Sequence, residues 1–233
     1  MAKTVTSPST ANQRAGRAWP IEPPGVWLEL RRPAPSGAPR PALFLDRDGV
    51  IVEDADYLAD PRRAVLVAGA AELIAAANRA RVPVAVVTNQ SGIDQGLYGW
   101  AEFASVEAEI ERLLAARGAS IDAVAACPFH PEATAGFGVG HAAWRKPGPG
   151  MIATLAARLR VDRARSWLVG DRGRDVAAAK GAGLAGAIIM TKSAVERAEA
   201  MAQSAAGFAV HEAASLAEAA MLLARRGLVM GDA

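Results

Sequence analysis

Apolar positions along this chain gather in short runs that end abruptly at polar or glycine residues. The run over 42–45 stops at Asp46, and a β-branched run over 82–87 stops at Thr88. Short continuous apolar runs bounded by turn residues indicate buried strands. The remaining runs predict further strands over 121–126, 166–169, 185–190 and 208–210.

Between these runs, the apolar positions recur every three or four residues in segments rich in alanine. That spacing and composition predict helices, the last of which has Ser215 as its expected N-cap. The predicted helices cover 69–80, 101–117, 149–160, 174–181, 194–204 and 215–226. Strands that alternate with helices predict an α/β fold, a Rossmann-like three-layer sandwich with a central parallel sheet.

Chemistry-bearing residues follow four of the predicted strands. Asp46 and Asp48 follow the first, Thr88 the second, Lys146 a glycine-rich stretch after the third, and Asp171 the fourth. The carboxyl ends of parallel strands share one edge of a sheet, and ligands bind there. The two aspartates repel each other unless a cation or a shared proton relieves them, and Mg²⁺ is the usual cation where phosphates are handled.

Each feature also has a plainer interpretation. Paired aspartates after a strand also form solvated turns, or hold a metal against a diphosphate in nucleotide-sugar transferases. Thr88 is equally a turn residue, Lys146 with its basic neighbour a solvated loop, and Asp171 a helix cap. We expect Asp175 to orient a neighbouring group rather than bind a metal. One site explains the whole set, whereas the plainer interpretations must each hold separately.

Taken in order, the motifs resemble those of the haloacid dehalogenase superfamily of phosphatases, from about residue 41 to about 226. The closer similarity is to its small branch without a cap domain, which contains heptose bisphosphate and histidinol phosphatases. The segments that carry this resemblance are Phe44-Leu45-Asp46-Arg47-Asp48-Gly49-Val50-Ile51, Thr88-Asn89-Gln90-Ser91-Gly92-Ile93 with Gly96 and Tyr98, Cys127-Pro128-Phe129-His130-Pro131, Arg145-Lys146-Pro147-Gly148-Pro149-Gly150-Met151, and Val169-Gly170-Asp171-Arg172.

The resemblance implies a covalent mechanism. Asp46 is the implied nucleophile, which forms an aspartyl-phosphate, and Asp48 the general acid and then base. An Asp46 oxygen, the Asp48 backbone carbonyl and the Asp171 carboxylate are the implied Mg²⁺ ligands. The Thr88 hydroxyl, the Asn89 amide and Lys146 are the implied phosphoryl contacts. The full set of implied phosphate and substrate contacts is Arg47, Asp54, Tyr57, Thr88, Asn89, Gln90, Ser91, Arg145, Lys146 and Arg172.

The intervals between motifs are too short for an inserted cap domain, so we expect an open site. By resemblance, Asp54, Tyr57, Arg145 and Arg172 lie where the rest of the substrate binds. Arg145 is the expected contact of a second phosphate because its fork suits bidentate binding. The alternative role for Tyr57 is to pack beneath the flap formed by residues 50–60. The stretch from 127 to 145 is expected to be a loop.

One departure from the family concerns a structural zinc. Relatives often hold zinc with a Cys-x-His pair and a later Cys-x-Cys pair, whereas this chain has Cys127-Pro128-Phe129 and Ala142-Ala143-Trp144. A structural zinc site requires four ligands. We therefore expect no structural zinc, with Phe129 and Trp144 packing in its place. A makeshift site from Cys127, His130 and His141 is the alternative.

Composition adds bounds on partners and location. A single cysteine excludes a disulfide framework, and the absence of a long apolar run or signal-peptide core favours a cytoplasmic protein without membrane partners. The chain carries a net charge of +2, and residues 1–40 carry six Lys/Arg and two Glu, a net of +4. Residues 41–233 therefore carry −2, which argues against a nucleic-acid surface.

The expected organisation is a mostly disordered basic segment over 1–40 with a short strand over 25–30, a phosphatase domain over 41–228, and a tail over 229–233. We expect a monomer, although the sequence does not fix the oligomeric state. The expected function is Mg²⁺-dependent hydrolysis of a small sugar phosphate, with a heptose bisphosphate of a surface-sugar pathway favoured by Tyr98 and the run after Thr88. The alternatives are a histidinol-phosphate phosphatase and a phosphate- or metal-binding module without turnover.

Overall fold

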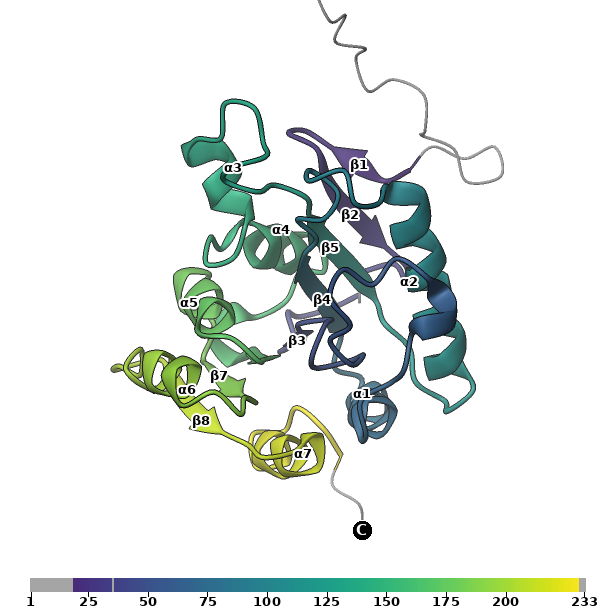
Figure 1. Ribbon diagram of the computed structural model, residues 1–233. Helices are drawn as coiled ribbons and strands as arrows, with labels where there is room; N and C mark the ends of the chain where they lie inside the picture. The colour runs from purple at the N-terminus through teal and green to yellow at the C-terminus, as the bar shows by residue number, and fades with distance from the viewer. Residues whose placement is uncertain (1–18, 35, 231–233) are drawn as a thin grey trace, which may run out of the picture.

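The computed structural model describes residues 19–34 and 36–230 and is built around one eight-stranded sheet (Figure 1). The strand order is β1-β2-β5-β4-β3-β6-β7-β8. From β5 to β8 the neighbouring strands are parallel, whereas β1 and β2 add an antiparallel edge. The strands are β1 (Ile21–Glu22), β2 (Val26–Leu30), β3 (Leu43–Leu45), β4 (Val84–Asn89), β5 (Ala123–Cys127), β6 (Trp167–Gly170), β7 (Gly186–Ile189) and β8 (Ala209–Glu212).

Helices cover both faces of the sheet, as the alternating pattern predicts (Figure 1). Buried side chains of α1, α2 and α7 pack in one hydrophobic cluster, and those of α4 and α5 pack in a second cluster on the opposite face. The helices are α1 (Ala70–Arg79), α2 (Trp100–Ala115), α3 (Val139–Trp144), α4 (Gly150–Arg158), α5 (Gly173–Gly181), α6 (Ala194–Met201) and α7 (Leu216–Ala224).

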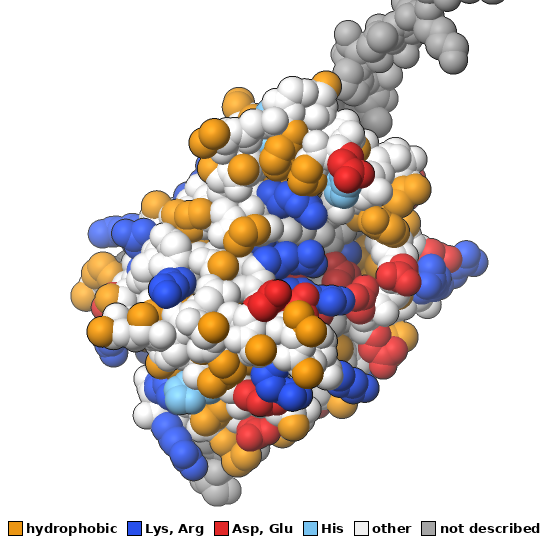
Figure 2. Space-filling view, turned by 60° about the vertical axis from the view of Figure 1, so that its left-hand side comes forward, with side chains coloured by type: hydrophobic (Ala, Val, Ile, Leu, Met, Phe, Trp, Pro, Cys, Tyr) orange, Lys and Arg blue, Asp and Glu red, His pale blue; other side chains and the backbone are white. Residues whose placement is uncertain are grey.

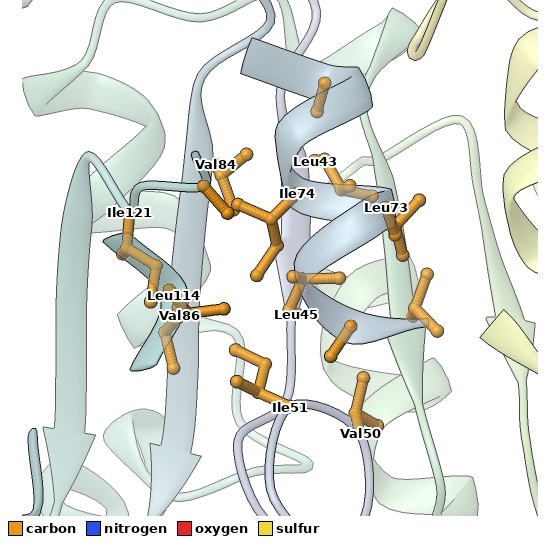
Figure 3. Packing of buried hydrophobic residues seen from close by; sticks show 14 of the residues in the cluster. Leu43, Leu45, Val50, Ile51, Leu73, Ile74, Val84, Val86, Leu114 and Ile121 are labelled. Atoms are coloured by element: carbon orange, nitrogen blue, oxygen red, sulfur yellow. The ribbon is translucent and has the colours of Figure 1, made fainter. Parts of the chain in front are cut away.

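Alternation along β3 and β4 divides the core between these two clusters. Leu43 and Leu45 join the cluster beneath α1, whereas Phe44 lies between them in sequence and joins the cluster on the other face. Figure 3 shows Leu43 and Leu45 beside Leu73 and Ile74 of α1. Because both faces of these strands are buried, their sequences are continuous apolar runs. The buried strands hold the residues that directly follow them in fixed positions.

The six predicted strands and six predicted helices all form, with ends shifted by a few residues. The Ser215 hydroxyl caps α7 by accepting the Glu218 N–H at 3.2 Å. The stretch over 127–145 is not entirely a loop, however, because the short helix α3 forms within it. It contains a glycine, Gly140, and no buried residues, so no apolar periodicity predicted a helix.

The expected domain boundary at residue 41 needs correction. The short strand expected over 25–30 forms as β2 and pairs with β5 along four residue pairs. Trp27 on this strand is 1% exposed and its ring lies 5.2–5.7 Å from those of Trp19, Trp100 and Phe103. The residues over 19–30 are therefore part of the same sheet and core as the rest. The disorder expected for 1–18 lies outside the described residues.

The expected tail also begins later than predicted. Val229 is buried, and the Met230 N–H donates to the Ala76 carbonyl of α1 at 3.2 Å. Residues 231–233 lie outside the described residues. Within the described part of the chain, no helix combines the length and the apolar character needed to cross a membrane.

Candidate active site

A cleft of about 310 Å³ lies at the carboxyl ends of β3, β4 and β6. Figure 2 shows acidic and basic side chains gathered around a hollow of this surface. The cleft is lined by every residue that the sequence placed in the site: Asp46, Arg47, Asp48, Asp54, Tyr57, Thr88, Asn89, Gln90, Ser91, Arg145, Lys146, Asp171 and Arg172. The strand register thus brings together motifs that lie up to 126 positions apart in the chain.

Lys146 lies at the centre of the acidic floor and is 1% exposed at its side chain. Its Nζ lies 2.8 Å from Asp46 Oδ1, 2.6 Å from Asp175 Oδ1 and 2.8 Å from the Val87 carbonyl oxygen. These contacts use the three donors of the ammonium group. Burial lowers the pKa of Lys146, but the two carboxylates outweigh burial and raise it, so the lysine carries a fixed positive charge.

Asp175 is fully buried and its second oxygen accepts the Arg172 N–H at 3.0 Å. The carboxylate therefore connects the start of α5 to Lys146. This geometry agrees with the expectation that Asp175 orients a neighbouring group. Gly170 leaves the space for it, because a Cβ at position 170 would lie 2.5 Å from Asp175 Cβ.

Asp48 faces away from the Lys146 cluster and is held by three neighbours. The Arg47 Nη2 and Nε donate to it at 2.9 and 3.1 Å, the Gln90 amide donates at 2.8 Å, and the Thr88 hydroxyl lies 3.4 Å away. About a quarter of the Asp48 side chain stays exposed to the cleft. A carboxylate with one exposed face suits proton exchange with a bound ligand.

Arg47 and Gln90 line the cleft but are almost fully buried. Their exposed fractions are 1% and 3%, and their polar groups bind Asp48, Glu107, Thr88 and Tyr98. Arg47 also stacks over the Phe103 ring, with Cζ 5.4 Å from its centroid. Both side chains hold Asp48, and their expected contact with substrate stays a prediction.

Thr88 and Asn89 end β4 beside the two acidic groups. Thr88 is 1% exposed, and its hydroxyl accepts the Gln90 amide at 2.7 Å. The Asn89 side chain pairs reciprocally with the backbone of Lys146, at 3.1 Å to its carbonyl and 3.0 Å from its N–H. Asn89 thereby fastens the Lys146 segment to β4, a role that the sequence did not predict.

A divalent cation fits the carboxylates of this floor. Oxygens of Asp46, Asp171 and Asp175 lie within 4.8 Å of one another, and carboxylate oxygens are the ligands that Mg²⁺ prefers. Gly49 has a φ of +84°, and a Cβ there would lie 2.8 Å from Asp171 Oδ2, so only glycine lets the chain after Asp48 approach that carboxylate. The Asp48 side chain is not in this group, and the expected metal contact of its backbone carbonyl stays a prediction.

Basic side chains form the rim of the cleft. Arg172 pairs with Asp171 at 3.1 Å and with Asp54 at 3.5 Å. Burial and the positive charge of Arg174 together lower the pKa of Arg145. Two guanidinium groups that repel each other across a cleft favour an anion between them. Tyr57 is 48% exposed and bonds Gln95, so it does not pack beneath the flap.

The segment after β5 is held by side-chain contacts where relatives often hold zinc. His141 packs edge-on against Phe129 at 4.6 Å and stacks on Phe137 at 5.8 Å. Phe129 and Trp144 both pack on the second hydrophobic cluster. Among the described residues, the acidic floor is the one set of three or more potential ligands close enough to hold a metal, so Cys127, His130 and His141 are not gathered into a site.

Sequence reasoning missed three contributors. Arg174 and Asp56 line the cleft without having been singled out, and neither sits in a distinctive motif. Glu107 lies behind the cleft, 3% exposed. A signal for it was available: positions 103, 107, 110 and 114 form the buried stripe of α2, and a glutamate in such a stripe requires a charged partner.

Burial raises the pKa of Asp46 to about 7, with Lys146 opposing that shift, and raises the pKa of Asp171 to about 6. In the metal-free protein these acids bind protons more tightly folded than unfolded. Their protons therefore stabilise the fold below pH 4, and this contribution is lost as the pH rises through about 6 to 7. A metal that binds the same carboxylates must displace those protons.

We expect Mg²⁺ to raise the melting temperature more at pH 8 than at pH 5.5. Proton competition should weaken its apparent affinity at pH 5.5 by at least about tenfold, which lowers the shift by about 2–4 °C at saturating metal. Thermal unfolding with and without Mg²⁺ at the two pH values measures this. Asp46→Asn is the control in which the pH dependence should shrink, and an equal shift at both pH values in the wild type would contradict the expectation.

Comparison with known proteins gives concordant results. A family model described as HAD-hydrolase-like matches residues 143–219. A D-glycero-beta-D-manno-heptose-1,7-bisphosphate 7-phosphatase of Mesorhizobium japonicum is 44% identical over 172 residues, which are 74% of this chain and 79% of that protein. A protein of the same description from Rhodopseudomonas palustris is 41% identical over 63% of this chain and 82% of its own length.

Solved structures agree with the sequence matches. A HAD-like phosphatase from Mesorhizobium loti superposes with a TM-score of 0.77 and 39% identity, over 92% of this chain and all of that one. The D,D-heptose 1,7-bisphosphate phosphatase of B. bronchiseptica, solved with magnesium and phosphate, gives a TM-score of 0.66 and 33% identity over 79% of this chain and 98% of that one.

Proposed function

Because the chain belongs to the D-glycero-D-manno-heptose-1,7-bisphosphate 7-phosphatase family of haloacid dehalogenase-like hydrolases, we propose that it removes one phosphate from a heptose bisphosphate. The alignments with two relatives of this description span 79% and 82% of the length of those proteins. The enzyme is a phosphatase, and Mg²⁺ is its cofactor.

One observation carries the choice of a bisphosphate. A single cleft joins an acidic floor suited to phosphoryl transfer with a rim that holds Arg145, Arg172 and Arg174. Burial, and then the positive charge of Arg174, lower the pKa of Arg145, so the two guanidinium groups repel each other. A second phosphate relieves this repulsion, whereas the ammonium group of histidinol phosphate increases it. The rim therefore favours the heptose bisphosphate over the amine.

In the proposed first step, an Asp46 oxygen attacks phosphorus and the bond to the sugar oxygen breaks, which gives an aspartyl-phosphate and a sugar alcohol. Lys146 fixes the attacking carboxylate through its contact with Asp46 Oδ1. The backbone N–H of Arg47 holds the same oxygen at 2.8 Å, so the nucleophile cannot rotate freely. Bound Mg²⁺, held by Asp46, Asp171 and the Asp48 carbonyl, would neutralise charge on the phosphoryl group.

Asp48 is proposed to donate the proton that the leaving sugar oxygen takes up. In the second step the same carboxylate removes a proton from water, which hydrolyses the aspartyl-phosphate. Its bonds to Arg47 and Gln90 hold one edge of the carboxylate and leave the cleft side exposed. Thr88 and the Asn89 backbone amide are proposed contacts of the phosphoryl group, and Asp54, Tyr57 and Ser91 of the sugar. A module without turnover has no use for this full set of groups.

Release of inorganic phosphate from a small substrate panel tests the proposal. With Mg²⁺ we expect a heptose 1,7-bisphosphate to react with a kcat/KM at least about tenfold above that of histidinol phosphate, since a buried charged contact is worth that much. Chelation of Mg²⁺ should abolish both reactions. Arg145→Gln should raise KM for the bisphosphate and leave KM for the heptose 7-monophosphate nearly unchanged. Equal or better hydrolysis of histidinol phosphate would overturn the substrate assignment.

A further inference from the structure

Four buried or partly buried charges of alternating sign connect the sheet edge to the cleft. Arg31, directly after β2, places Nη2 2.9 Å from Glu107 Oε2 of α2. The other oxygen of Glu107 lies 3.4 Å from Arg47 Nη1, and Arg47 binds Asp48. The side chains of Arg31, Glu107 and Arg47 are 9%, 4% and 1% exposed. The order is cation, anion, cation, anion, so each charge is flanked by an opposite one.

The geometry of Arg47 makes its two carboxylate contacts interdependent. The guanidinium is planar, with Nε and Nη2 directed at Asp48 and Nη1 directed at Glu107. One orientation of the plane serves both acids at once, and the Phe103 ring supports it from one side. Arg47 Nη2 also donates to Gln90 Oε1 at 3.0 Å, but among the described contacts Glu107 is the acidic partner of Nη1, so removing its charge weakens the hold on the rotation of the guanidinium plane.

Arg31 fixes Glu107 in turn. Its Nε is anchored by Glu29 Oε2 at 3.1 Å, and its backbone N–H donates to the Asp122 carbonyl at 2.8 Å, so the arginine is held at the sheet edge. The two oxygens of Glu107 are thus divided between two arginines from different parts of the chain. Because both of its oxygens are bound, Glu107 is restricted in orientation, and it restricts the orientation of Arg47 in turn.

We propose that Glu107 and Arg31 are positioning residues, which hold Arg47 and through it orient the Asp48 carboxylate for proton transfer to the leaving group. The inference rests on the proposed function, because it assigns a task to the acid of that reaction. It gives the strand β2 a second role besides covering the sheet edge. Neither residue touches the cleft, since neither lines it.

The leaving group provides a readout that a general loss of structure would not move. A sugar alkoxide needs a proton as it departs, whereas p-nitrophenolate leaves without one. The second step, in which Asp48 acts as base, is common to both substrates and contributes to kcat, so the comparison uses kcat/KM, which reports the steps up to departure of the leaving group. We expect Glu107→Gln to lower kcat/KM for the heptose bisphosphate by about tenfold more than for p-nitrophenyl phosphate, a part of the 10²–10⁴ that general acid catalysis supplies. Arg31→Met should give the same pattern with a smaller ratio, because Glu107 keeps its contact with Arg47.

Two controls separate positioning from a structural role. Glu109→Gln, on the same helix and in an exposed pair with Arg112 at 2.7 Å, should leave both reactions unchanged. In an Asp48→Asn background, Glu107→Gln should lower kcat/KM for the heptose bisphosphate no further, because the group it positions is already absent. The comparison in the Asp48→Asn background is made with the heptose bisphosphate and does not require p-nitrophenyl phosphate. Thermal unfolding of each variant shows that the folded protein is compared.

The outcomes distinguish this inference from the proposed function. A larger loss on the sugar substrate than on the aryl phosphate, together with no further loss in the Asp48→Asn background, supports it. Equal losses on both substrates, or a full additional loss in that background, would assign Glu107 and Arg31 to fold stability and overturn the inference while leaving the phosphatase intact. A wild-type protein that hydrolyses neither substrate overturns the proposed function and this inference with it.

Discussion

Asp46→Asn is expected to lower kcat by at least about 10⁴-fold, because loss of a covalent nucleophile removes the pathway rather than weakening it. The amide has nearly the same shape and keeps an oxygen for the Arg47 N–H, which now contacts Asp46 Oδ1 at 2.8 Å. The amide of the variant is not a nucleophile that can form an acyl-phosphate. Phosphate release from the heptose bisphosphate and from p-nitrophenyl phosphate measures the loss, which should be similar for both because both need the nucleophile.

Stability of the same variant provides an independent control. Burial disfavours the ionised form of Asp46, as its raised pKa of about 7 reflects. In the absence of metal at pH 8, Asp46→Asn should therefore unfold at the same temperature as the wild type or higher, since active-site charges are held at a cost to stability. Acid-quenched wild-type enzyme should retain phosphate from substrate, and the variant should not. Substantial residual turnover in a variant that folds normally would rule out Asp46 as the nucleophile.

The acidic floor of the cleft was predictable because its residues follow strands that are themselves strong signals. Apolar runs that end at Asp46, Thr88 and Asp171 locate three neighbouring strand ends, and parallel pairing of β3 with β4 and β6 then brings them together. Lys146 was placed by its motif, and the reciprocal bonds with Asn89 explain how a loop residue reaches the same floor.

What escaped prediction depends on contacts distant in sequence. The alternation over 25–30 predicted the strand that forms as β2, but not its partner, because it pairs antiparallel with β5, about 97 positions later. Arg47 was expected to contact the substrate, and its burial beside Asp48 was not foreseen. Its burial is compensated by Glu107, which faces it from helix α2. Local sequence identifies which side chains carry charge, whereas their partners decide whether those charges meet solvent.

Lys146→Met is expected to lower kcat by about 10³-fold, at the upper end for loss of one preorganised electrostatic group. Methionine matches the lysine stem in length but leaves Asp46 and Asp175 facing each other without the cation that lies 2.8 and 2.6 Å from them. Breaking a buried ion pair from one side also costs about 3–5 kcal/mol of folding free energy. Phosphate release and denaturant unfolding measure the two losses, and Lys180→Met on the surface of α5 is the matched control, for which neither should change.

The pH dependence of the Lys146→Met variant distinguishes an electrostatic role from loss of structure. In the wild type, the positive charge of Lys146 lowers the pKa of Asp46, which burial would otherwise raise further. Removing that charge leaves burial and the neighbouring carboxylates, so the pKa of Asp46 rises above about 7 and a smaller fraction is ionised at neutral pH. The variant should therefore recover part of its activity between pH 7 and pH 9, whereas the wild type should change less over that range. A profile parallel to that of the wild type would show that Lys146 acts on the phosphoryl group alone and not on the charge state of Asp46.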